Sequence, residues 1–258
     1  GKEGTKRTMS TIAVLTLNGY YNYGNRLQNY ATQEVLKSLG YDVETIINDR
    51  TKKTANRSLM ERAFSLKKYS FKQLCTKVDH KIWSKIRKSS IEKRTKIFKQ
   101  FTRDYITETN YKISEGYIPS NLSDRYSYFV TGSDQVWNPD NIHGFSIYFL
   151  TFADKRKRIA FAPSFGVSKI KHEYVDRYKK WISDIPCLSV REKEGAKIIK
   201  ELTGRDAPVL VDPTLLLNEE KWLSISKEAD NKPKCNYLLT YFLGNVTKKS
   251  KRQIQNIA

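Results

Sequence analysis

The fold is decided by residues 11–47, which read TIAVLTLNGYYNYGNRLQNYATQEVLKSLGYDVETII. The first seven residues of this stretch predict a buried strand, and the last seven predict a second one. Between them, apolar residues recur at helical spacing and predict the buried face of a helix that Gly40 ends: Leu27, Ala31, Val35 and Leu39. Strand, short glycine-containing loop, helix and strand form the βαβ pattern of a parallel sheet with right-handed crossovers.

The same alternation resumes later in the chain. Strands are predicted at YSYFVTG (126–132), RIAFAPSFG (158–166), CLSVRE (187–192) and PVLVDP (208–213). Helices are predicted at YVDRYKKWISDI (174–185) and at EGAKIIKELTG (194–204), where Gly204 is the stop signal. Residues 10–215 therefore predict an open, doubly wound, Rossmann-like α/β domain.

A further segment follows the connector that starts at residue 216. Residues 236–258 predict a strand, a turn at Gly244 and Asn245, and the opening of a helix. One strand and one helix cannot bury their own apolar faces. We therefore expect residues 216–258 either to dock on the first domain or to be a linker and the start of a second Rossmann-like domain. Residues 1–9 are polar and unpatterned, and we treat them as a tag or a disordered leader.

Positive charge is concentrated in one block. The chain of 258 residues has a net charge of +20, and residues 52–103 hold 17 Lys and Arg residues against 3 Asp and Glu residues. The block belongs to a helical, basic and aromatic insertion at about residues 52–109, which interrupts the strand and helix alternation. Apolar residues at three-to-four spacing predict an amphipathic helix there: Phe71, Leu74, Val78, Ile82, Trp83 and Ile86.

The basic block is suited to an anionic partner. Tyr69, Phe71, Trp83 and Phe98 alternate with its positive charges. The candidate partners are an anionic membrane surface, an RNA and an acidic glycan. We favour peripheral contact with the inner face of a cell membrane, and we disfavour nucleic acid because no nucleic-acid-binding motif accompanies the charge. The ordinary alternative is a solvated helical face.

Composition excludes several other classes of protein. With 39% hydrophobic residues the chain can bury a sizeable core, which excludes a disordered protein. No apolar run approaches the roughly 20 residues that span a bilayer, and no apolar secretion signal is present, so we expect a cytoplasmic protein. Cys75, Cys187 and Cys235 are odd in number and widely spaced, which argues against a disulfide framework and against a metal site.

Ligands of doubly wound sheets bind at the carboxyl ends of the strands. Four loops fall at such ends: NGYYNYGNRLQNY, TGSDQVWNPDN, APSFG and SVREKEG. In the first loop, Gly24 and Asn25 precede a helix whose free N–H groups and dipole can receive an anion. The alternative, which composition alone favours, is that Asn25 caps the helix and Gly24 is a turn residue.

The second loop combines polar and aromatic residues. Asp134 and Gln135 offer a general base and an orienting amide, and Trp137 offers a flat face to a sugar ring or an enol. A tight turn around a core tryptophan is the alternative.

The third and fourth loops offer a hydroxyl and a cation. Ser164 and Gly166 provide a side-chain hydroxyl and a close backbone approach, or they form an ordinary strand end. Arg191 can grip a carboxylate or phosphate through two nitrogens, or it can pair with Glu192 or Glu194, which is the commoner outcome.

Six segments, in this order, resemble the polysaccharide pyruvyl transferase family: YYNYGNRLQNYATQEVLKSLGY, TGSDQVWNP, IAFAPSFG, LSVREKEGAKIIKELTG, VLVDPTLLL and YLLTYFLGN. They cover the alternating parts of residues 11–245 and leave the basic block outside. The resemblance implies a GT-B-like arrangement of two facing Rossmann-type domains. It also implies an enzyme that transfers the enolpyruvyl unit of phosphoenolpyruvate to two hydroxyls of one sugar, which forms a pyruvate ketal and releases phosphate without a metal or organic cofactor.

The resemblance also suggests roles for the loop residues. Arg191 becomes the main clamp for the donor phosphoenolpyruvate, and Asp134 becomes the candidate base. The other residues assigned to the donor are Gly24, Asn25, Ser164 and Gly166. The residues assigned to the acceptor, a sugar or lipid-linked oligosaccharide, are Asn22, Tyr23, Ser133, Gln135 and Trp137.

One departure from the family qualifies this interpretation. Family members also carry arginine and histidine in the second domain, and this sequence ends before that region. We therefore expect the 258-residue chain to be weakly active or inactive alone. The expected setting is the assembly of bacterial surface polysaccharides. A GT-B-type glycosyltransferase that uses a nucleotide sugar, and a non-catalytic anion- or RNA-binding module, remain as alternatives.

Overall fold

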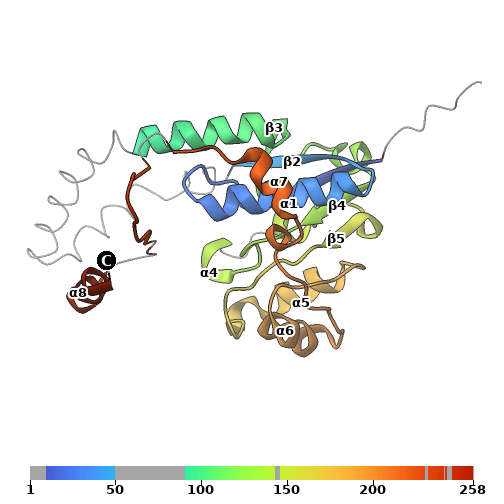
Figure 1. Ribbon diagram of the computed structural model, residues 1–258. Coiled ribbons are helices and arrows are strands. Elements are labelled where there is room, and N and C mark those ends of the chain that lie inside the picture. Colours follow the sequence, from blue (N-terminus) through green and yellow to red (C-terminus); the bar gives the residue numbers. More distant parts are fainter. Residues whose placement is uncertain are drawn as a thin grey trace, which may run out of the picture. The chain divides into compact units, whose positions relative to one another are not determined.

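Figure 1 shows the computed structural model of the chain, which describes residues 10–49, 91–142, 146–229, 232–240, 242 and 246–257. The chain divides into two compact units, Gly1–Leu217 and Asn218–Ala258. The first unit contains a β-sheet, and the second includes helices α7 (Glu219–Ile225) and α8 (Lys248–Ile257).

Five parallel strands form the sheet of the first unit in the spatial order β3-β2-β1-β4-β5 (Figure 1). Their bounds are β1 Thr11–Leu15, β2 Asp42–Asn48, β3 Glu108–Ile113, β4 Tyr128–Thr131 and β5 Arg158–Ala160. β1 lies at the centre, where Ala13 pairs with Glu44 of β2 and with Phe129 of β4. This is the strand order of the Rossmann fold, so the predicted Rossmann-like α/β class is confirmed.

Helices and short turns connect the strands. α1 (Tyr23–Ser38) follows β1, a helix over residues 91–105 precedes β3, and α4 (Pro139–Ile142) follows β4. α5 (Val175–Ser183) and α6 (Lys193–Thr203) follow β5. The short 3-10 turns are η2 (Leu122–Arg125), η3 (Ser146–Phe149), η4 (Lys155–Lys157), η5 (His172–Tyr174) and η6 (Pro213–Leu215). The helices predicted at residues 174–185 and 194–204 are confirmed, and α6 ends at Gly204 with a φ of 73°, the left-handed conformation typical of glycine at helix ends.

β3 lies outside the predicted strands and shortens the expected insertion. It begins at Glu108, whereas the insertion is expected to extend to about residue 109. The strand is mostly polar, and only Thr109 and Ile113 are buried, so hydrophobic periodicity does not reveal it. It pairs with β2 at the edge of the sheet, where a half-polar strand is tolerated.

The segments predicted as strands at residues 187–192 and 208–213 form single bridges instead of continuous ladders, at the pairs Ile159–Cys187 and Val190–Val209. Pro186 directly precedes Cys187, and Pro208 directly precedes Val209. Proline has no N–H to donate, so neither ladder can extend further on the amino side of its bridge. The segments still run beside the sheet and carry their carboxyl ends to the same edge.

The strand predicted near residue 236 is wrong for the part of it that the structure describes. Residues 232–240 and 242 have no regular secondary structure, and Leu239 is exposed. A strand needs a hydrogen-bonded neighbour, and the described part of the second unit supplies none. The helix predicted after it is confirmed as α8, while the turn at Gly244 and Asn245 lies outside the described residues.

The buried face of α1 agrees only in part with the predicted one. Of the predicted apolar stripe, Ala31 is fully buried and Val35 is partly buried, while Leu27 is 36% exposed and Leu39 is 67% exposed, so only the middle of the stripe faces the core. Most of the side chains that are buried are polar: Asn25, Arg26, Gln28, Asn29, Thr32 and Gln33. Apolar spacing is therefore an incomplete guide to the orientation of this helix.

Hydrogen bonds to the sheet explain the polar face of α1. Gln33 donates to Thr45 Oγ1 and to the Thr107 carbonyl, each at 2.8 Å, and accepts the Thr107 N–H at 3.1 Å. Thr45 Oγ1 donates to Asn29 Oδ1 at 2.7 Å. Buried polar groups need such partners, and directional bonds fix α1 at a single position over β2.

The helix over residues 91–105 packs against α1 through aromatic residues. The Phe98 ring lies 4.8 Å from the ring of Tyr23, and Arg94 lies over the same Tyr23 ring at 5.1 Å. Phe98 is buried, so the prediction that it belongs to an anion-binding surface is wrong. The other aromatic residues of that prediction, and its helix from Phe71 to Ile86, lie outside the described residues.

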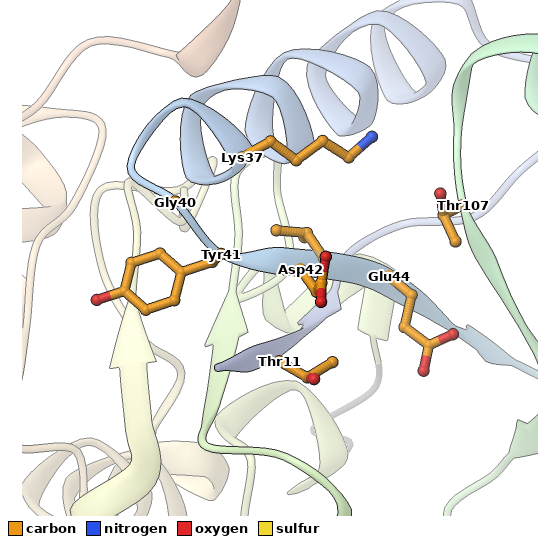
Figure 2. Close-up of a pocket in the computed structure, with 8 residues that line it drawn as sticks. Thr11, Lys37, Gly40, Tyr41, Asp42, Glu44 and Thr107 are labelled. Carbon is orange, nitrogen blue, oxygen red and sulfur yellow. The ribbon is translucent and has the colours of Figure 1, made fainter. Parts of the chain in front are cut away.

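A hollow of about 480 Å³ lies at the amino ends of β1 and β2 (Figure 2). Thr11 and Asp42, which begin the two strands, line it together with Lys37 near the end of α1. The Lys37 ammonium is paired with Glu34 at 3.2 Å. Because ligands of this fold class bind at the opposite, carboxyl ends of the strands, we do not take this hollow as the candidate site.

Replacing Gln33 with alanine is expected to destabilise the first unit by about 1–3 kcal/mol, because the variant leaves the Thr107 backbone groups without their side-chain partner. Urea denaturation measures the change. Leu39→Ala is the matched control, and it should change stability by less than about 0.5 kcal/mol because Leu39 is exposed. A larger loss for Leu39→Ala than for Gln33→Ala would favour the apolar face instead.

Candidate functional site

The candidate site lies where the strand order reverses. β1 and β4 are neighbours, while β2 and β5 lie on their outer sides. Thr16 follows β1 and Gly132 follows β4, at adjoining carboxyl ends. Open α/β sheets bind their ligands at this point, because the loops diverge there and leave a crevice.

The turn after β4 has a backbone that few residues adopt. Gly132 has a φ of 113°, and a Cβ atom there would lie 2.3 Å from the Phe161 carbonyl oxygen. Asp134 has a φ of 68°, which is uncommon for a residue with a side chain. Its carbonyl accepts the N–H groups of Val136 and Ser164, each at 2.8 Å. These bonds hold Asp134 in a conformation often found at functional sites.

The Asp134 carboxyl group is enclosed, and its charge is disfavoured. Burial raises the pKa of Asp134 above its ordinary value. A hydrogen bond from the Gln135 N–H, at 2.7 Å, and the positive charge of Arg191 act in the opposite direction without reversing the shift. Asp134 therefore keeps a proton more readily than a carboxyl group in water.

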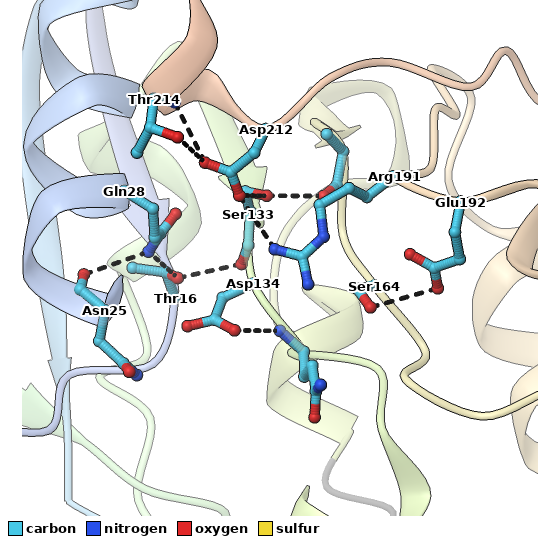
Figure 3. A network of polar contacts seen from close by, with 12 residues as sticks. Thr16, Asn25, Gln28, Ser133, Asp134, Ser164, Arg191, Glu192, Asp212 and Thr214 are labelled. Atoms are coloured by element: carbon cyan, nitrogen blue, oxygen red, sulfur yellow. Dashed lines mark hydrogen bonds and ion pairs between the residues drawn. The ribbon is translucent and has the colours of Figure 1, made fainter. Parts of the chain in front are cut away.

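A second carboxyl group faces the same region. Arg191 Nη1 lies 2.9 Å from Asp212 Oδ2, and Figure 3 shows the Arg191 guanidinium between Asp212 and Asp134. Ser133 Oγ lies 3.0 Å from the same Asp212 oxygen and 2.8 Å from the Ala162 carbonyl oxygen, so these two acceptors share its one proton. The other oxygen accepts the N–H and the hydroxyl of Thr214 at 3.1 and 2.9 Å. Asp212 thus accepts three hydrogen bonds, from Arg191 and Thr214, and a share of the Ser133 proton.

The two carboxyl groups have pKa values shifted in opposite directions. Burial acts to raise the pKa of Asp212, but hydrogen bonds from Thr214, Arg191 and Ser133 lower it below its ordinary value. The pKa of Asp134 is raised, as described above. Neighbouring carboxyl groups whose environments separate their pKa values are typical of acid–base sites.

The start of α1 supplies the first of the predicted ligand-binding loops. α1 begins at Tyr23, and Asn22 is its N-cap, because Asn22 Oδ1 accepts the Asn25 N–H at 3.3 Å. The alternative in which Asn25 caps the helix is therefore wrong. The Asn25 side chain is buried and donates to the Leu17 carbonyl at 3.3 Å. Gly24 and Tyr23 are exposed, and their roles in ligand binding, like those of Asn22 and Asn25, stay predictions.

Ser164 and Gly166 belong to a loop that Glu192 fastens. Glu192 Oε1 accepts the Ser164 hydroxyl at 3.2 Å and the Phe165 N–H at 2.8 Å. The Gly166 N–H donates to Ser164 Oγ at 3.1 Å. Glu192 is therefore not the partner of Arg191, contrary to the ordinary alternative. The role of Ser164 and Gly166 in donor binding stays a prediction.

Trp137 and Ser133, two residues of the predicted acceptor site, are buried in the structure. Trp137 is 0% exposed, stacks on Phe149 at 5.2 Å, and donates its indole N–H to the Tyr148 carbonyl at 3.1 Å. Ser133 is also fully buried. The prediction that these two residues contact an acceptor is wrong, because neither reaches the surface. Gln135 of the same loop is partly exposed and accepts a bond from Asn138 Nδ2 at 3.0 Å.

The structure places the Arg191 guanidinium between Asp134 and Asp212, and the catalytic roles of Asp134 and Arg191 stay predictions. The segment PVLVDP was predicted as a strand that Pro213 ends, and its acidic residue, Asp212, was not among the predicted site residues. The rule that located the other candidates applies equally to Asp212, because it too follows a segment of the sheet edge. Thr16 and Gln28 are buried polar residues, and no motif or position in the sequence indicates that they belong to the site.

No group of three or more His, Cys, Asp and Glu side chains that could hold a metal ion occurs in the part of the chain that the structure describes. Within the same residues, no helix has the length and apolar character needed to cross a membrane. The described cysteines, Cys187 and Cys235, are exposed free thiols.

The fold and site define a Rossmann-like α/β protein with an arginine between two carboxyl groups at the switch point of its sheet. The model of the family described as polysaccharide pyruvyl transferase matches residues 22–257. The chain therefore belongs to the polysaccharide pyruvyl transferase family, a family of transferases. No curated protein and no solved structure matches it significantly.

Replacing Asp134 with asparagine is expected to stabilise the protein at neutral pH. Folding raises the pKa of Asp134, so this carboxyl group contributes to the free energy of unfolding. The contribution is fully present below the ordinary pKa of 3.8, and it is lost as the pH rises through the pKa of the folded state. The neutral amide avoids that loss, and asparagine tolerates a positive φ. The melting temperature of the variant minus that of the wild type should therefore increase from about pH 4 to about pH 7.

Asp212→Asn provides the comparison of opposite sign. The lowered pKa of Asp212 contributes stability above the ordinary value of 3.8, and this contribution is lost as the pH falls through the folded-state pKa. The variant should therefore melt below the wild type at neutral pH, and the deficit should shrink in acid. A difference for Asp134→Asn that does not depend on pH would contradict the raised pKa.

Proposed function

We propose that this protein is a polysaccharide pyruvyltransferase, which transfers the enolpyruvyl group of phosphoenolpyruvate to a sugar diol during the assembly of bacterial surface polysaccharide. Membership of the family supports the general activity. The observation that carries the proposal is the placement of Arg191, Asp134 and Asp212 at the switch point of the sheet. This arrangement offers an anion clamp beside an acid–base group.

The reaction balances without a redox partner. Two oxygen atoms of the sugar form bonds to C2 of the enolpyruvyl group, and the bond between C2 and the phosphate oxygen breaks. Of the two hydroxyl protons, one adds to the methylene carbon to form a methyl group, and the other leaves with phosphate. The enzyme therefore needs cationic groups for the donor, and groups that move protons near C2 and near each hydroxyl.

Arg191 is suited to the donor. Its side chain is 29% exposed, so the guanidinium is partly desolvated but still accessible from solvent. A planar guanidinium can bind a carboxylate or a phosphate through two parallel N–H bonds. The 16-residue helix α1 begins nearby in the chain after β1, and its first N–H groups and dipole add to the attraction for an anion.

Asp134 is suited to proton transfer. Its raised pKa brings the carboxyl group closer to the working range of a general base or acid than an exposed aspartate. The bond from the Gln135 N–H orients the carboxylate. We assign to Asp134 the removal of a proton from an attacking sugar hydroxyl, while the partly exposed Gln135 contacts the acceptor.

The second candidate is a glycosyltransferase that uses a nucleotide sugar. The same strand order and the same switch point also bind nucleotides. The glycosyltransferase would bind a nucleotide sugar as its donor, whereas the pyruvyltransferase would bind phosphoenolpyruvate. The two donors therefore separate the two functions in a direct binding measurement.

Arg191→Ala is expected to weaken binding of phosphoenolpyruvate by at least about tenfold, as measured by isothermal titration calorimetry, because the donor loses a charge-assisted bidentate bond. Arg156→Ala is the matched control and should leave binding unchanged, because Arg156 is 90% exposed and pairs with Asp154.

Asp134→Asn should retain donor binding. Its release of phosphate, followed by ³¹P NMR with bacterial lipid-linked oligosaccharide fractions, should fall by about a hundredfold or more.

Binding of a UDP-sugar in place of phosphoenolpyruvate would transfer the assignment to the glycosyltransferase. Equal affinity of the Arg191→Ala and Arg156→Ala variants for phosphoenolpyruvate would show that Arg191 does not bind the donor.

A further inference from the structure

Asp212 is held more firmly than an ion pair with Arg191 requires. Besides the Arg191 bond at 2.9 Å, it accepts bonds from the N–H and the hydroxyl of Thr214, and it shares the Ser133 hydroxyl proton with the Ala162 carbonyl. These partners come from two separate places, the turn after β4 and η6. The carboxylate is thus oriented by the protein, and Arg191 is oriented by the carboxylate.

The support for Asp212 extends to α1. The Ser133 carbonyl accepts a bond from Thr16 Oγ1 at 3.2 Å, and Thr16 Oγ1 accepts one from Gln28 Nε2 at 2.7 Å. Thr16 and Ser133 are fully buried, and Gln28 is almost fully buried. Figure 3 shows this continuous chain of polar contacts from Gln28 to Arg191. Movement of Asp212 would break its contacts with Ser133, Arg191 and Thr214.

We propose that Asp212 is a positioning residue, which holds the guanidinium of Arg191 in the orientation that receives the anionic donor. Asp212 contacts only Nη1, and within the described residues the guanidinium makes no other hydrogen bond. The remaining N–H groups are therefore available to a carboxylate or phosphate. Arginine has about 2 kcal/mol of rotamer entropy, and a side chain that is already fixed loses less of it on binding.

A simple electrostatic role makes the opposite prediction. A negative charge 2.9 Å from Arg191 repels an anionic donor, so its removal alone should strengthen donor binding. A positioning role predicts that removal of the charge weakens donor binding despite the lower repulsion. The sign of the change in affinity for phosphoenolpyruvate thus separates the two roles. This part of the inference rests on the proposed function.

The first experiment tests the orientation of Arg191 without any donor. The full chain is treated with phenylglyoxal, a dicarbonyl reagent for arginine, and the modified peptides are quantified by mass spectrometry. In Asp212→Asn, which preserves the shape of the side chain, Arg191 should react several-fold faster than in the wild type. Arg205, which donates to the Ile185 carbonyl at 2.8 Å, reports local unfolding and should keep its rate.

Asp206→Asn is the control variant, because Asp206 is exposed and forms the similar pair with Lys200 at 2.9 Å. It should leave the reactivity of Arg191 unchanged. Asp212→Glu keeps the charge and should restore part of the protection, so it tests the inference if Asp212→Asn does not fold. An unchanged rate at Arg191 in both Asp212 variants would overturn the proposal.

The second experiment measures binding of phosphoenolpyruvate by calorimetry. Asp212→Asn should raise the dissociation constant by about fivefold or more, and should have no further effect in an Arg191→Ala background, because the two residues act together. Unchanged or tighter binding by Asp212→Asn would overturn the positioning role. If the wild type does not bind phosphoenolpyruvate, the proposed function fails, and the reactivity of Arg191 alone decides whether Asp212 holds it.

Discussion

The candidate site depends on the hydrogen bonds that join the polar face of α1 to the ends of β1 and β4. Thr16 accepts a bond from Gln28 and donates one to the Ser133 carbonyl, and all three residues are buried. A buried polar group without a partner costs about 1–3 kcal/mol, so few arrangements of helix and strands are tolerated. Apolar packing alone would allow more freedom, because it has no direction. The positions of Asp134 and Arg191 therefore depend on these hydrogen bonds.

Environment distinguishes the two carboxyl groups of the site. The Asp134 carboxyl group is largely buried and, among the described residues, accepts a hydrogen bond from its neighbour Gln135 alone, so burial dominates and raises its pKa. Asp212 is also buried in part, but donors from Ser133, Thr214 and Arg191 surround it and lower its pKa. The same residue type is thereby suited to proton exchange in one place and to a permanent charge in the other.

Much of the fold could be predicted because it depends on local patterns. The apolar run from Thr11 predicts β1, and Gly204 predicts the end of α6 by supplying a left-handed φ. The edge strand β3 could not be predicted in this way, because one neighbour and partial burial impose little periodicity. The inward face of α1 was predicted correctly only at its middle, because polar side chains such as Gln33, bonded to Thr45 and Thr107, occupy much of that face.

The sequence by itself determined the class of fold, the family, and the strand-end loops that carry Asp134 and Arg191, because periodicity, turns and motifs are local properties. Only the tertiary structure decided which residues of those loops are open to a ligand. It placed Trp137 in the core and brought Asp212 beside Arg191 from 21 positions along the chain. Burial and ion pairing depend on segments that meet only when the sheet has formed, so no local pattern can specify them.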